Sequence, residues 1–253
     1  MRRKIIAGNW KMYLTHSEAV SMIREFKELM RGVKTDYEIV ICPPFTSLYL
    51  VSEELKGTEF KLGAQNLFYE SEGAYTGEIS PKMLTALGCS YVIIGHSERR
   101  KYFYETDDVI LKKVKAAMEA GLTPILCVGE NLEDRNKGIE KDVVRKQFKA
   151  VFGGLGGKDF DKIVIAYEPV WAIGTGVNAT PEQAQEMHGF LRDLFKEMFG
   201  SDNVTIIYGG SVKPDNIHAL TSMPDVDGAL VGGASIKAKS FFEIIMNASK
   251  EGN

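Results

Sequence analysis

Eight short apolar runs recur at regular intervals along the 253-residue chain, and helix-like segments separate them. The runs occupy residues 4–8, 38–42, 61–64, 91–95, 123–128, 162–167, 204–208 and 228–231. Their first residues lie about 32 positions apart on average, a spacing typical of strands that alternate with helices. Most runs are continuous rather than alternating, which predicts strands covered on both faces, as in a parallel sheet.

The segments between these runs carry helical periodicity. The clearest are residues 17–31, 109–120 and 181–199, and Thr180 before Pro181 is a good start signal for the last of them. Eight strands alternating with helices, without a linker-like stretch, predict one (β/α)8 barrel of parallel strands ringed by helices over residues 1–253. An open doubly wound sheet is the alternative, but no glycine-rich phosphate loop follows the first run.

Charge and composition indicate which kinds of partner, cell compartment and metal the protein is expected to have or to lack. The formal net charge of −3 gives no reason to expect nucleic acid or an anionic membrane surface as a partner. No apolar run is long enough to span a bilayer. The apolar stretch near residue 1 is too short for a signal peptide, so we expect none. Cys42, Cys89 and Cys127 form no paired framework, so we expect reduced thiols in a cytoplasmic protein. No histidine pair has metal-ligand spacing, and we expect no metal.

Polar side chains gather where the expected strands end, which is where (β/α)8 barrels carry their chemistry. Asn9 and Lys11 follow the first strand, His96 and Glu98 the fourth, and Glu168 the sixth. Burial at the end of an apolar strand is expected to raise the pKa of Glu168 and make it a better base, although a strand-end carboxylate can instead cap a neighbouring helix. A positioned imidazole can polarise a carbonyl or donate a proton. Lys11, paired with Glu98, can stabilise developing negative charge, unless it is merely solvated.

Two glycine-rich segments follow the last two expected strands, at residues 209–211 (GGS) and 232–235 (GGAS). Backbone N–H groups can approach an anion closely where no Cβ intervenes, so these segments predict a phosphate site, although glycines also serve tight turns. After Glu168 come Pro169, an apolar "VWAI" and two glycines, Gly174 and Gly176. A stiff start and a pliable end are typical of a lid that excludes water.

Nine segments between residues 8 and 235 resemble the signatures of the triosephosphate isomerase family. They are GNWKM (8–12), CPPF (42–45), LGAQN (62–66), GAYTGEIS (73–80), VIIGHSERR (92–100), PILCVGE (124–130), AYEPVWAIGTG (166–176), YGGSVKPDN (208–216) and LVGGAS (230–235). The resemblance covers essentially the whole chain in the family's order.

This resemblance implies cofactor-free interconversion of dihydroxyacetone phosphate and D-glyceraldehyde 3-phosphate through an enediolate. In the family, a glutamate base works with a neutral histidine electrophile, which Glu168 and His96 match. By the same resemblance, Lys11 supplies positive charge and Asn9 orients the substrate oxygens. Glu98 is then the carboxylate partner of the segment that carries Lys11. The residues that the resemblance assigns to the phosphate are Gly174, Ser211, Gly232 and Gly233.

The resemblance also implies a homodimer in which the segment 66–80 inserts beside the partner's site, with Thr76 at the contact. Tyr13 and Val177 depart from the family pattern, the first near the subunit interface and the second just past the lid. Cys127 matches a family cysteine near the base, and we interpret it as structural packing.

Two other functions fit the same fold. A Schiff-base aldolase would use Lys11 as a nucleophile. A barrel without catalysis would keep only the phosphate site, although the chain retains every expected catalytic side chain.

Overall fold

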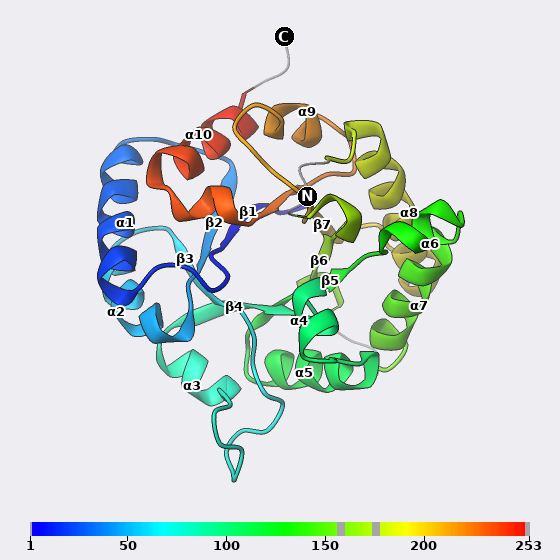
Figure 1. Ribbon diagram of the computed structural model, residues 1–253, viewed down its shortest axis with the longest axis horizontal. Coiled ribbons are helices and arrows are strands. Elements are labelled where there is room, and N and C mark those ends of the chain that lie inside the picture. Colours follow the sequence, from blue (N-terminus) through cyan, green and yellow to red (C-terminus); the bar gives the residue numbers. More distant parts are fainter. Residues whose placement is uncertain (1, 156–159, 174–177, 251–253) are drawn as a thin grey trace.

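Eight parallel strands form a closed barrel in the computed structural model, which describes residues 2–155, 160–173 and 178–250, residue 161 by its backbone alone. The strands are β1 (Lys4–Asn9), β2 (Tyr37–Cys42), β3 (Lys61–Ala64), β4 (Cys89–Ile94), β5 (Thr123–Val128), β6 (Val164–Tyr167), β7 (Thr205–Tyr208) and β8 (Gly228–Val231). Each strand pairs with its neighbour in sequence, and β1 also pairs with β8, which closes the ring (Figure 1). The eight expected strands are confirmed, with ends that agree within two residues.

Helices surround the barrel, as the alternating pattern predicts (Figure 1). They are α1 (His16–Leu29), α2 (Phe45–Leu55), α3 (Pro81–Ala86), α4 (Ser97–Tyr102), α5 (Asp107–Glu119), α6 (Leu132–Asn136), α7 (Glu140–Phe152), α8 (Pro181–Phe199), α9 (Ile217–Thr221) and α10 (Ala238–Ala248), with 3-10 turns η1 (Phe160–Lys162), η2 (Val170–Ala172) and η3 (Gly233–Ile236). The start of α8 matches the sequence signal, because Thr180 and Gln183 form a reciprocal capping box. None of the described helices is both long and apolar enough to cross a membrane.

Both faces of the strands are buried, which explains why the apolar runs are continuous. Along β1, Ile5 and Ala7 belong to a cluster inside the barrel, whereas Ile6 packs with the helices outside. Cys127 lies in the inner cluster, where burial and then the charge of Glu168 raise the pKa of its thiol. A thiol that stays protonated is a poor nucleophile, so the structural interpretation of Cys127 agrees with its surroundings.

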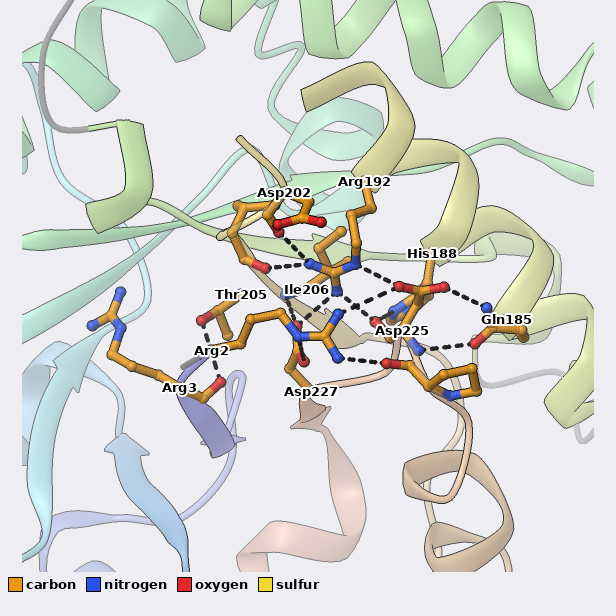
Figure 2. A network of polar contacts seen from close by, with 12 residues as sticks. Arg2, Arg3, Gln185, His188, Arg192, Asp202, Thr205, Ile206, Asp225 and Asp227 are labelled. Atoms are coloured by element: carbon orange, nitrogen blue, oxygen red, sulfur yellow. Dashed lines mark hydrogen bonds and ion pairs between the residues drawn. The ribbon is translucent and has the colours of Figure 1, made fainter. Parts of the chain in front are cut away.

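A buried arginine ties together the N-terminal ends of the last strands (Figure 2). Arg192 of α8 uses all five guanidinium N–H groups, which donate to both carboxylates, Asp225 (2.5 Å) and Asp227 (3.0 Å), and to three backbone carbonyls. Arg2, just before β1, pairs with Asp227 at 3.1 Å. This network lies at the end of the barrel opposite the loops that follow the strands, where residues serve stability rather than chemistry.

His188 borders the same network and has a structural role. Its Nδ1 lies 3.2 Å from the carbonyl oxygen of Asp225, and its ring meets that of Tyr167 edge-on. Burial lowers the pKa of the imidazole to about 4, so His188 is neutral near pH 7.

Replacement of Arg192 by methionine is expected to lower the free energy of unfolding by about 3–5 kcal/mol, because it removes one charged partner from each of Asp225 and the buried Asp227 and takes the donor away from three backbone carbonyls. Urea unfolding at one fixed protein concentration measures the change. The control is Arg31→Met, which removes an exposed ion pair with Glu28 and should cost less than about 1 kcal/mol. Equal unfolding midpoints for the two variants would contradict this account of the network.

Candidate active site

A cavity of about 340 Å³ opens at the C-terminal end of the barrel. Its wall combines polar residues expected at the strand ends with residues of the two glycine-rich segments. They are Asn9, Lys11, His96, Ser211, Gly232 and Gly233. Glu98 lines an adjoining hollow, and Glu168 contacts His96. Gly174 lies outside the described residues, as does Val177. The barrel therefore brings together eight of the nine expected site residues from five different strand ends.

Glu168 follows β6 directly and is buried, with 1% of its surface exposed. Its Oε2 accepts a hydrogen bond of 2.8 Å from the backbone N–H of Ser97, the first residue of α4. Its Oε1 lies 2.9 Å from Nε2 of His96, but no described group gives Oε1 a well-aligned hydrogen bond. The carboxylate thus caps a neighbouring helix and at the same time faces the imidazole, so the two readings of this residue are compatible.

The pKa of Glu168 is lower than that of an ordinary glutamate in this arrangement. Burial raises it, as the sequence indicates, but His96, the Ser97 N–H and Lys11 together outweigh burial. The expectation of a raised pKa is therefore wrong for this state, because it considered burial without these partners. A carboxylate stabilised in this way becomes a stronger base only when it leaves these partners.

Two glycines make room for the backbone and side chain of Glu168. A Cβ on Gly129 would lie 1.7 Å from the carbonyl oxygen of Glu168, and a Cβ on Gly209 would lie 2.9 Å from its Cγ. Gly209 belongs to the segment that the sequence assigned to phosphate. In the structure its missing side chain gives space to the base as well.

His96 is placed by the start of α4, where it is the N-cap residue and 6% exposed. Its Nδ1 accepts a hydrogen bond of 3.2 Å from the backbone N–H of Glu98, so Nδ1 is unprotonated and Nε2 faces Glu168. Burial lowers the pKa of His96, whereas the carboxylates of Glu168 and then Glu98 raise it, and the net direction is upward.

Lys11 lies on a constrained loop after β1, with a positive φ of 52°. Its Nζ pairs with Glu98 Oε1 at 2.6 Å, as the sequence suggested, and Asn9 Oδ1 accepts from its backbone N–H at 3.1 Å. Gln65 donates from Nε2 to the carbonyl oxygens of Lys11 and Cys42, both at 2.9 Å. The sequence assigns Gln65 no role beyond its place in the segment LGAQN (62–66). It holds the backbone from which the Lys11 ammonium extends.

The described part of the segment after Glu168 is anchored by Glu130, a second residue that sequence reasoning left without a role. Trp171 Nε1 donates to Glu130 Oε1 at 2.8 Å, and Tyr167 Oη donates to the same oxygen at 3.0 Å. The backbone N–H of Val170 bonds to the Glu130 carbonyl at 3.0 Å. These contacts hold the stiff start of the expected lid against the barrel.

Among the described residues, no three His, Cys, Asp or Glu side chains are grouped so that they could hold a metal ion. The expected absence of a metal and of a cofactor stays a prediction.

A carboxylate–imidazole pair at one end of a pocket and glycine-rich loops at the other define a (β/α)8-barrel site suited to proton transfer on a small phosphorylated substrate. A family model described as triosephosphate isomerase matches residues 4–248. Proteins named triosephosphate isomerase are 57% identical in Dictyoglomus thermophilum, 54% in Fusobacterium nucleatum and 52% in Carboxydothermus hydrogenoformans, each over 97% of this chain and 98–99% of the relative. The chain belongs to the triosephosphate isomerase family.

The variant Glu168→Gln is expected to lower the pKa of His96, because it removes the largest contribution that raises it while burial and Lys11 remain. NMR titration of the His96 ring measures the shift. Glu98→Gln should also lower the pKa, but by less, since the Glu98 contribution ranks below that of Glu168. An unchanged or higher pKa in Glu168→Gln would show that the pair does not interact in solution as it does here.

Proposed function

We propose that the chain interconverts dihydroxyacetone phosphate and D-glyceraldehyde 3-phosphate by proton transfer through an enediolate, without a cofactor. The family and the names of its relatives support this activity. The observation that carries the residue assignment is the 2.9 Å contact between Glu168 and His96 beside a cavity whose far wall is Ser211, Gly232 and Gly233. A substrate carbon skeleton held by its phosphate at that wall reaches the acid–base pair.

In the first step, Glu168 leaves the Ser97 N–H and His96 and takes a proton from the carbon next to the carbonyl. Without these partners, burial raises the pKa of the carboxylate and makes it a stronger base. His96 then loses the contribution that raises its own pKa most, so the imidazole is neutral and donates a hydrogen bond from Nε2 to the carbonyl oxygen.

In the second step, Glu168 returns the proton to the neighbouring carbon while His96 moves a proton between the two oxygens. The enediolate carries negative charge, which the ammonium of Lys11 stabilises. Asn9 helps to orient the oxygens of this intermediate. Ser211, Gly232 and Gly233 hold the phosphate through backbone N–H groups. Proton transfer needs a base, an electrophile and an oxyanion partner, and these residues supply all three.

The described residues of the site do not favour a Schiff-base aldolase. Lys11 Nζ lies 2.6 Å from Glu98, and an ammonium held against a carboxylate has no free lone pair for attack on a carbonyl.

A second copy of this chain is the partner that the surface around the site supports. The segment 66–80 projects from the barrel beside α3 (Figure 1). The lining of a hollow of about 570 Å³ next to the active site includes the apolar side chains of Met12, Phe45 and Phe103 among polar ones, and Met12 is 95% exposed. We propose a homodimer in which each copy inserts its segment 66–80, with Thr76 at the contact, into the hollow of the other.

We also propose a cytoplasmic location. Cys42, Cys89 and Cys127 are all free and buried, so none of the cysteines takes part in a disulfide. Thiols of this kind persist in reducing compartments.

The variant Glu168→Gln is expected to lower kcat by about 10²–10⁴-fold, because an amide cannot accept the carbon-bound proton. A turnover assay with D-glyceraldehyde 3-phosphate measures kcat, and competitive inhibition by inorganic phosphate should stay close to that of the original chain. Glu119→Gln, an exposed change of the same charge on α5, is the control and should keep full activity. Near-normal turnover in Glu168→Gln would refute the assignment of the base.

A carboxylate introduced into the hollow is expected to separate the two copies. Met12→Asp should give a monomer at micromolar concentration, because the new carboxylate would lose its hydration if the interface formed over it. Light scattering after size exclusion measures the mass, and Leu132→Asp, an exposed apolar residue on α6, is the control. A dimer that persists in both Met12→Asp and Thr76→Arg would contradict this interface.

A further inference from the structure

Lys213 lines the same cavity as the phosphate-binding loops, and the proposed chemistry gives it no role. It comes two residues after Ser211, on the loop between β7 and α9. Its side chain is exposed. The cavity has only one other lysine among its described lining residues, Lys11, which serves the acid–base end.

The loop that carries Lys213 is fixed by hydrogen bonds. Asn216 Oδ1 accepts from the backbone N–H of Lys213 at 2.8 Å, and Asn216 Nδ2 donates to the carbonyl of Ser211 at 3.0 Å. Asn247 of α10 donates to the carbonyl of Pro214 at 2.6 Å. The backbone of Lys213 therefore has a set position relative to Ser211, although its side chain reaches into solvent.

The two lysines differ in how their charge is balanced. Lys11 is paired with Glu98 at 2.6 Å, so much of its charge is neutralised before a substrate arrives. No described carboxylate lies within ion-pair distance of the Lys213 ammonium. Ser211, Gly232 and Gly233 offer N–H dipoles to the phosphate but no full charge. Among the described residues that line the cavity, a phosphate dianion that approaches this wall meets one unbalanced cation, Lys213.

We propose that Lys213 supplies the unbalanced positive charge that attracts the phosphate group of the substrate to the glycine-rich wall of the cavity. This inference rests on the proposed function. Attraction of this kind acts over several ångströms and needs no fixed contact, so an exposed, mobile ammonium on a fixed backbone can provide it. It speeds the encounter and strengthens phosphate binding, and it leaves the proton-transfer step at Glu168 and His96 unchanged.

The test compares Lys213→Met with Lys149→Met, which removes one exposed lysine on α7, away from the cavity. At an ionic strength of about 0.01 M, Lys213→Met should lower kcat/KM for D-glyceraldehyde 3-phosphate by about 3–10-fold with kcat unchanged, and the loss should shrink at about 0.3 M. Inhibition by inorganic phosphate should weaken in parallel. Lys213→Arg should restore both, and turnover of phosphate-free glyceraldehyde should not change.

Two results would overturn the role of Lys213. One is a kcat/KM and a salt dependence in Lys213→Met that match those of the original chain. The other is a loss of kcat/KM that is equal at all ionic strengths and extends to glyceraldehyde, which would indicate a structural defect. Absence of turnover in the original chain would instead contradict the proposed function. In that case, calorimetric titration with inorganic phosphate tests whether Lys213 strengthens phosphate binding. Equal Kd values for the original chain and Lys213→Met would overturn its role.

Discussion

The burial of one carboxylate, that of Glu168, dictates how the mouth of the barrel is built. Removing a charge from water costs several kcal/mol unless nearby groups stabilise it. Here the first N–H of α4, the imidazole of His96 and the ammonium of Lys11 do so. The same helix end also positions His96 and Glu98, so a single short helix holds the proposed base, the proposed electrophile and the carboxylate that pairs with Lys11. Substrate binding has to compete with these contacts.

The two ends of the barrel divide stability and chemistry between them. At the N-terminal end, every donor of Arg192 is satisfied by a carboxylate or a carbonyl, which favours a rigid, closed sheet. At the C-terminal end, Lys11 keeps a positive φ and Glu168 Oε1 lacks an aligned hydrogen bond. Groups that are strained or incompletely bonded are costly in the free protein, but they can form better contacts with a transition state.

The sequence reveals positions along the barrel but not the partners of each side chain. Apolar runs mark the strands, so the residue after each run must lie at the mouth, and this places Asn9, His96 and Glu168 correctly. The direction of the Glu168 pKa depends on a backbone N–H of Ser97, which no sequence pattern indicates. The role of Gln65 could not be predicted for a similar reason. Its side chain donates to the carbonyl oxygens of Lys11 and Cys42, and only the folded chain brings these two residues close to it.

The contact between Glu168 and His96 makes their protonation states interdependent. While they face each other, the imidazole lowers the pKa of the carboxylate and the carboxylate raises the pKa of the imidazole. Movement of Glu168 towards a substrate carbon reverses both effects together, since burial then acts on each group alone. The carboxylate becomes more basic and the pKa of the imidazole falls in one movement. In the proposed mechanism, the free enzyme therefore keeps the buried carboxylate stabilised and still presents a stronger base beside a neutral imidazole when the substrate is bound.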